Sequence, residues 1–168
     1  SFSDRSLIHK RIDEILDSSQ LTNDGKYLLQ FEKEISAKIK TPSLAVANAT
    51  LGLILTMKGL GVKGNIIMPS FTFCATSHSI VWAGLKPKFV DIDAKTLNID
   101  PKKVEEAIDD NTVAIVGVHT FGNPCDIDSL TKIARKNNLK LLFDAAHAFG
   151  TEYKGKPIGG FGDAEVFS

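Results

Sequence analysis

Apolar positions recur at helical spacing near the start of the chain. Leu7 to Leu16 and then Tyr27 to Ile39 each place apolar residues on one face with charged residues between them, which is the pattern of an amphipathic helix. Thr41-Pro42 ends the second pattern, because proline disfavours helical geometry in the residue before it. The sequence therefore predicts an N-terminal helical arm over residues 1–40 and a main domain over residues 41–168.

The main domain alternates between short apolar runs and helical patterns. Strands are predicted at 43–47, 65–68, 88–92, 112–118, 140–144 and 164–168, and helices at 51–57, 76–83, 101–108 and 126–136. The run at 112–118 is apolar almost throughout, as in strands buried on both faces of a sheet. A tight turn is predicted at Lys154-Gly155, between two short extended arms. This alternation predicts an α/β domain with a mostly parallel sheet and helices on both of its faces.

Composition narrows the class of protein. The 168 residues are 43% hydrophobic and 24% charged with no net charge, which is ordinary for a globular protein and supplies no field for nucleic acid or an anionic membrane. No apolar run is long enough to span a bilayer, and the N-terminus lacks the order of a signal peptide. Cys74 and Cys125 have no metal-site spacing, which predicts reduced thiols. We expect a cytoplasmic protein with neither nucleic acid nor membrane as a partner.

Candidate chemistry begins where the strand at 140–144 ends. Asp144 closes this strand, and two alanines separate it from His147. Ligands of open α/β sheets bind at the carboxyl edge of the strands. A carboxylate that leaves a buried strand there is desolvated and favours a cationic partner, such as a protonated ring nitrogen. The alternative is that Asp144 only caps a loop or the next turn.

Other strand ends offer further candidates, each with a structural alternative. Asn48-Ala49-Thr50 lies between a predicted strand and a helix, where amides and the helix dipole favour a phosphate, or where a side chain simply caps the helix. Phe73 either stacks on a planar ligand or belongs to the core. His119, after the strand at 112–118, either faces the ligand or fixes its own loop.

These segments together form a recognisable series. The series is Asn48-Ala-Thr50, Met68-Pro-Ser-Phe-Thr-Phe73, Phe89-Val-Asp-Ile-Asp93, Val118-His-Thr-Phe-Gly122, Phe143-Asp-Ala-Ala-His147-Ala-Phe-Gly150, Tyr153-Lys-Gly-Lys156 and Gly162-Asp-Ala-Glu-Val-Phe-Ser168. In order and spacing it resembles the N-terminal part of the DegT/StrS-type sugar aminotransferases, which are fold-type-I enzymes dependent on pyridoxal phosphate. The implied fold is an incomplete fold-type-I large domain without the small C-terminal domain.

The resemblance implies a cofactor-binding role for Ala49, Thr50, Phe73, Asp144, His147 and Ser168. Asp144 would hold the protonated pyridine nitrogen of pyridoxal phosphate, and Phe73 would stack on its ring. His147 stands where the family more often has Gln, near the ring hydroxyl. The phosphate would be bound by Ser168 together with Ala49 and Thr50, and Ala49 replaces a frequent Gly of the family.

The catalytic residue of the family has no counterpart here. The lysine that forms the Schiff base lies a few residues beyond the serine that matches Ser168, and Lys154 and Lys156 are predicted to be solvated. We therefore expect this chain to be inactive alone. In the family, the strand after that lysine inserts between the strands matching 43–47 and 164–168, so a slot in the sheet and a homo-oligomer that covers it are expected.

The implied activity of the complete relative is amino-sugar biosynthesis. An amino group would pass from a donor such as glutamate to a keto sugar linked to a nucleotide. Two alternatives stay open: this chain is a catalytically silent, truncated α/β module for binding or oligomerisation, or it belongs to sugar dehydratase relatives in which a histidine replaces the lysine.

Overall fold

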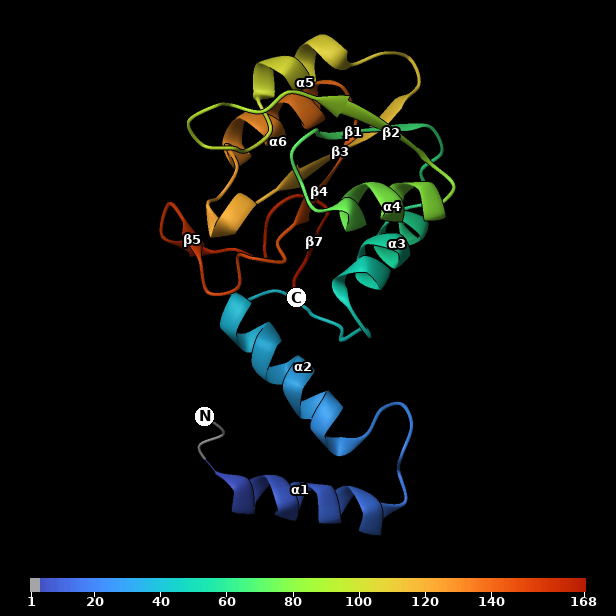
Figure 1. Ribbon diagram of the computed structural model, residues 1–168, viewed down its shortest axis with the longest axis vertical. Coiled ribbons are helices and arrows are strands. Elements are labelled where there is room, and N and C mark those ends of the chain that lie inside the picture. The colour runs from blue at the N-terminus through green and yellow to red at the C-terminus, as the bar shows by residue number, and fades with distance from the viewer. Residues whose placement is uncertain (1–3) are drawn as a thin grey trace. The chain divides into compact units, whose positions relative to one another are not determined.

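The computed structural model describes residues 4–168, and the first three residues of the predicted arm lie outside this range (Figure 1). The chain folds into two compact units, one that ends at Ala45 and one of Val46–Ser168. Within residues 4–168, no helix has both the length and the apolar character needed to cross a bilayer.

The N-terminal unit consists of the two predicted helices. Helix α1 is Arg5–Ser18 and helix α2 is Lys26–Ile39. Asp4 begins α1 by accepting a hydrogen bond from a backbone amide of the first turn, which stabilises a helix N-terminus. Helix α2 ends at Ile39, and its C-cap residue Lys40 has a left-handed φ of 59°, just before the predicted Thr41-Pro42 stop.

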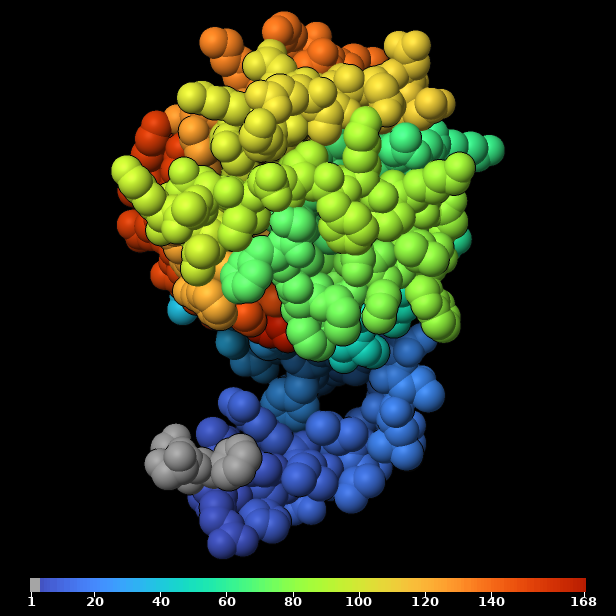
Figure 2. All heavy atoms as spheres, turned by 45° about the horizontal axis from the view of Figure 1, so that its top comes forward, coloured from blue at the N-terminus to red at the C-terminus, as the bar shows by residue number. Residues whose placement is uncertain are grey.

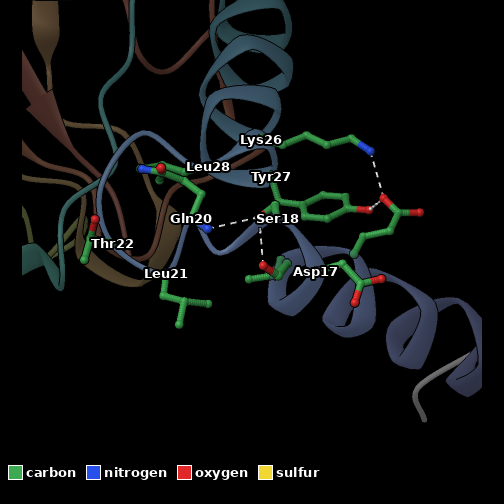
Figure 3. Close-up of a pocket in the computed structure, with 11 residues that line it drawn as sticks. Asp17, Ser18, Gln20, Leu21, Thr22, Lys26, Tyr27 and Leu28 are labelled. Carbon is green, nitrogen blue, oxygen red and sulfur yellow. Dashed lines mark hydrogen bonds and ion pairs between the residues drawn. The ribbon is translucent and has the colours of Figure 1, made fainter.

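Polar contacts join α1 to α2. The Glu14 carboxylate accepts hydrogen bonds from Lys26 Nζ at 2.8 Å and Tyr27 Oη at 2.6 Å. Figure 3 shows Lys26 and Tyr27 reaching the same carboxylate. The Arg11 guanidinium lies 5.4 Å from the centre of the Tyr27 ring, within the range of a cation–π contact. The start of α2 is therefore held against the middle of α1 by one charged network.

The Glu14 network predicts a measurable titration. Hydrogen bonds from Lys26 first, and then from Tyr27, lower the pKa of Glu14 from its usual 4.5 to about 2. Because the folded pKa is the lower one, the network stabilises the helix pair fully above pH 4.5 and loses that effect as the pH falls through 2. A carboxyl NMR titration should find this low pKa and a higher one in Tyr27→Phe. An ordinary Glu14 pKa in the wild type would contradict the contact.

The second unit contains a parallel sheet with helices on both faces (Figure 1). Its strands run in the order β2-β1-β3-β4-β7. The strands are β1 Asn65–Pro69, β2 Lys86–Val90, β3 Thr112–Val118, β4 Lys140–Asp144 and β7 Ala164–Val166. The helices are α3 Ala49–Gly59, α4 Cys74–Trp82, α5 Pro101–Ala107 and α6 Ile127–Lys136, with a short 3-10 turn at Thr120–Gly122. The predicted α/β fold class is confirmed.

Alternation along the strands divides the core into two layers. Leu142 of β4 packs in the layer that contains α3 and α4 residues, together with Val116 of β3. Phe143 and Ile115 belong to the opposite layer, with α5 and α6 residues. Successive side chains of a strand point to opposite faces, so Asp144 follows Leu142 toward α4. This alternation decides which helices can contact each residue at the carboxyl edge.

The predicted turn at Lys154-Gly155 is confirmed as a small antiparallel pair. Strand β5 is Glu152–Tyr153 and strand β6 is Lys156–Pro157. The backbone at Lys154 has a φ of 51° and that at Gly155 a φ of 76°, which is the left-handed geometry that two-residue hairpin turns require.

Two strand predictions need correction. Residues 43–47 are not a strand, since they pair with no neighbour and the Ala45 amide donates instead to the Glu32 carboxylate at 2.7 Å. The predicted internal slot is therefore absent between the paired strands of residues 4–168, where β7 is an edge strand. The strand predicted at 88–92 lies at Lys86–Val90, because its pairing with β1 runs from Lys86 to Val90.

Candidate functional site

Asp144 lies at the carboxyl edge of β4 with 7% of its surface exposed. The Thr76 hydroxyl of α4 donates to its Oδ2 at 2.8 Å, and the Ala146 amide donates to its Oδ1 at 3.2 Å. The second bond is the turn-capping contact considered as an alternative, but the first carries the side chain across to a helix. Both donors are neutral, so a buried carboxylate here has no countercharge in its hydrogen bonds and favours a cationic ligand group.

The N-terminus of α3 has amides without an acceptor inside the helix. Asn48 caps α3 by accepting from the Leu51 amide at 2.9 Å, so the capping alternative is realised. The preceding amides, those of Ala49 and Thr50, belong to the first turn and have no intrahelical acceptor. Such amides and the helix dipole favour an anion.

Helix α3 also lies against the strand that leads to Ser168. A Cβ atom at Gly52 of α3 would lie 2.8 Å from Val166 Cγ1 of β7, so a larger residue there would force α3 or Val166 to shift. Ser168, two residues farther on, is exposed. The Thr50 carbonyl accepts from the Ser79 hydroxyl of α4 at 3.2 Å. Helix α4 is thus bonded to Thr50 through Ser79 and to Asp144 through Thr76.

Phe73 stands at the N-cap position of α4 and is 76% exposed, so the alternative of a core phenylalanine is wrong. His147 is also exposed. Its ring stacks on Phe121, with 6.1 Å between centroids and 10° between planes, and Phe71 meets Phe121 edge-on at 6.3 Å. Figure 2 shows the segments after β1 and β3 side by side on one face. An aromatic surface therefore lies at the carboxyl edge of the sheet.

Sequence reasoning missed Phe121 and Thr76. The sequence places Phe121 in a loop motif but assigns no function to it. Its φ of 53° is left-handed, and a phenylalanine gives no sign of such a backbone conformation, as a glycine would. Thr76 was predicted only as the start of a helix. The one usable signal was the position of each residue just after a strand, at the edge where ligands bind.

His119 fixes its own loop, which is the second of the two alternatives predicted for it. It is 1% exposed and its Nδ1 accepts a hydrogen bond from the Cys125 amide at 3.1 Å. Its ring stacks on Phe143 at 4.8 Å, in the layer that faces α6. His119 and Asp144 therefore point to opposite faces of the sheet, although the His119 amide donates to the Asp144 carbonyl at 3.0 Å.

The two candidate lysines do not contact Asp144. The Lys154 ammonium pairs with Asp128 of α6, and this hydrogen bond raises the pKa of Lys154. Lys156 is exposed at the start of β6. Within residues 4–168, the side-chain carboxylate of Asp144 accepts hydrogen bonds only from the Thr76 hydroxyl and the Ala146 amide.

The two cysteines are free thiols with different surroundings, which gives a labelling prediction. Cys125 is fully buried, burial raises its pKa to about 12, and its thiol donates to the Val118 carbonyl. Cys74 is exposed. Because the thiolate is the reactive form, a thiol reagent should modify one cysteine in the folded chain and both after denaturation. Cys74→Ser should abolish labelling of the folded chain, and rapid labelling that persists in this variant would contradict the burial of Cys125.

Comparison with known proteins gives a consistent result. The model of the DegT/DnrJ/EryC1/StrS aminotransferase family matches residues 3–168. A dTDP-4-amino-4,6-dideoxy-D-glucose transaminase of Shigella dysenteriae is 45% identical over 155 residues, or 92% of this chain and 42% of that protein. The structure of DesI with its TDP-sugar product has a TM-score of 0.95 and 46% identity, over 98% of this chain and 42% of DesI.

A dehydratase is also similar to this chain. The GDP-4-keto-6-deoxymannose-3-dehydratase ColD, solved with bound GDP-perosamine, has a TM-score of 0.87 and 32% identity, over 100% of this chain and 46% of ColD. The chain thus spans less than half the length of these relatives. The family model nevertheless covers residues 3–168 in full, and the resemblance inferred from the motifs is confirmed. This chain belongs to the DegT/DnrJ/EryC1/StrS aminotransferase family.

Proposed function

We propose that the Val46–Ser168 unit is the cofactor-binding half of an aminotransferase site that acts on a nucleotide-linked keto sugar. The observation that carries the proposal is the Asp144 carboxylate, buried at the carboxyl edge of the sheet with only neutral hydrogen-bond donors. A protonated pyridine nitrogen supplies the cation that this environment favours. When bound, pyridoxal phosphate supplies an electron sink for the carbon that gains or loses the amino group.

The donor set fits this cofactor. Asp144 holds the ring nitrogen, and the exposed Phe73 stacks on the ring. The amides of Ala49 and Thr50 at the start of α3, with the exposed Ser168, bind the phosphate. His147 contacts the ring hydroxyl. Family membership and the similarity to sugar transaminases support these assignments.

The chain alone and the complete relative differ in the reactions proposed for them. Lys154 is paired with Asp128, so it is not available to the cofactor. We infer that the 168-residue chain binds pyridoxal phosphate without transferring an amino group, whereas the complete relative takes one from a donor such as glutamate. The edge strand β7 and the exposed Trp82 and Phe89 favour a homo-oligomer. The same proposal assigns residues 1–40 to an arm and 41–168 to part of the large domain.

Titration with pyridoxal phosphate tests the proposal directly. Binding should raise the thermal midpoint and perturb the cofactor's absorbance, because the ligand binds only the folded state. Pyridoxal without the phosphate is the matched control and should bind more weakly, since it cannot use the α3 amides. Equal responses to both compounds would contradict the proposed phosphate site. No response to either compound would favour the alternative of a catalytically silent module.

Dehydration is the second candidate reaction, favoured by the similarity to ColD along the whole chain. The groups proposed here to hold the cofactor serve both reactions, so they do not discriminate between them. With the complete protein, amino transfer would convert glutamate to 2-oxoglutarate in step with formation of an amino sugar. Loss of a sugar hydroxyl without a new carbon–nitrogen bond in the product would favour the dehydratase.

A further inference from the structure

His119 and Glu165 form a buried polar pair beneath the carboxyl edge. Their side chains are 0% and 1% exposed, and His119 Nε2 lies 3.5 Å from Glu165 Oε1. The other Glu165 oxygen faces the Phe161 amide at 3.4 Å. This pair joins the end of β3 to β7, and none of the roles proposed above uses it. A polar pair so completely buried is costly unless each group has a partner.

The hydrogen bonds fix the tautomer of His119. Nδ1 accepts from the Cys125 amide, so it carries no proton, and the ring proton resides on Nε2. Nε2 therefore donates toward Glu165. Stacking on Phe143 at 4.8 Å and 18° holds the ring plane, and Phe143 is in register with Glu165 across β4 and β7. The imidazole is thus held on two edges and one face.

The loop that His119 begins carries the aromatic surface. The Cys125 amide closes this loop onto the His119 ring, and the Gly122 amide donates to the His119 carbonyl at 3.0 Å. Between them, Phe121 has a left-handed φ of 53° and is 72% exposed. A non-glycine residue in this region is strained and persists only where its surroundings fix it.

The same loop lies tightly against the segment that carries His147. A Cβ atom at Gly122 would lie 2.9 Å from the His147 carbonyl oxygen, so a displaced loop would collide with His147 or leave it. The Phe121 ring stacks on the His147 ring. On its outer side the loop is bound by Asn98, whose amide donates to the Asn123 and Pro124 carbonyls at 3.0 Å. On its inner side the loop is bound at Cys125, whose amide donates to His119 Nδ1 and whose thiol donates to the Val118 carbonyl.

We propose that the His119–Glu165 pair is a positioning device for His147. Glu165 holds the Nε2–H edge of His119, His119 holds the loop through Cys125, and the loop places Phe121 over the His147 ring. The side chains of the pair lie on the face of the sheet opposite the Asp144 carboxylate, and the loop connects them to His147. Only the functional consequence, the contact of His147 with a cofactor, rests on the proposed function.

Glu165→Leu is the decisive variant, because leucine fills the site but accepts no hydrogen bond. We expect exchange of the Cys125 amide to accelerate about tenfold, the effect of losing one hydrogen bond that restrains the loop. The NOE contacts between the Phe121 and His147 rings should disappear. Thr112→Val is the matched control, since it removes a buried hydroxyl at the opposite end of β3 and should leave both signals unchanged.

A second variant keeps the proposal testable if Glu165→Leu fails to fold. His119→Asn retains an acceptor for the Cys125 amide but cannot reach Glu165 or stack on Phe143. We expect the Cys125 amide to exchange faster than in the wild type, as in Glu165→Leu, and the Phe121–His147 contacts to weaken. In the wild type, long-range proton–nitrogen spectra should show the His119 proton on Nε2. A proton on Nδ1, or ring contacts unchanged in both variants, would overturn the proposal.

Cofactor binding separates this proposal from the proposed function. If the wild type binds pyridoxal phosphate, Glu165→Leu should weaken binding while Thr112→Val should not, and equal affinity in Glu165→Leu would overturn the role of the pair. If the wild type does not bind the cofactor, the proposed function fails. The exchange rate, the tautomer and the ring contacts would then still decide whether the pair positions His147.

Discussion

Asp144→Ala is expected to weaken pyridoxal phosphate binding by roughly thirtyfold or more. Removing one partner of a buried, hydrogen-bonded charge pair costs about 2–5 kcal/mol, which corresponds to roughly thirtyfold to several thousandfold in affinity. Asp144 falls in this class because it is 7% exposed and its hydrogen-bond donors, Thr76 and Ala146, are neutral. Absorbance titration of the wild type and the variant measures the loss directly.

Asp144→Asn tests whether cofactor binding depends on the charge of residue 144 or only on its shape. Asparagine has nearly the volume of aspartate and retains an oxygen that can accept from Thr76, but it has no charge for a protonated nitrogen. Binding should be lost in this variant as well. Asp163→Asn is the matched control, because Asp163 accepts the Leu141 amide at the opposite end of β4, at 2.8 Å. Full binding by Asp144→Asn would contradict the proposed ion pair, and lost binding by Asp163→Asn would indicate damage to β4 instead.

The sequence predicted most elements because their signals are local. The helical spacing of α1 and α2 and the apolar run of β3 each lie within one segment, and the structure places them there. The segment at 43–47 has the same apolar character, but a strand also needs a neighbour. The Ala45 amide is bound by Glu32 and not by another strand. Pairing is a property of two segments, so no pattern within one of them could decide it.

The candidate site shows the same difference between residues that one segment reveals and contacts that depend on two segments. Asp144 was found because it closes an apolar run, which is visible in the sequence. Its partner Thr76 lies 68 positions away, and the contact between His119 and Glu165 spans 46 positions. Such contacts depend on strand order and on which face each side chain takes. Strand alternation also resolved the two alternatives for His119, since it places His119 opposite Asp144.

Phe143→Ala is expected to give the largest loss of stability. Phe143 is fully buried and packs in the layer that faces α5 and α6. Truncation of a buried phenylalanine costs about 3–5 kcal/mol, because apolar contact is lost and a cavity remains. It also removes the face on which His119 stacks. Urea denaturation followed by circular dichroism measures the change in free energy of unfolding.

A double-mutant cycle with Gly117 tests the packing behind this expectation. A Cβ atom at Gly117 would lie 2.8 Å from two atoms of the Phe143 ring and 3.2 Å from Cys125 Sγ, so Gly117→Ala alone should cost about 1–3 kcal/mol by overpacking. In the Phe143→Ala background the ring is gone, and the added methyl group partly fills the cavity. The second substitution should then cost much less. Additive losses, within about 0.5 kcal/mol, would show that the ring does not press on Gly117 and that the packing around Phe143 is looser than in this structure.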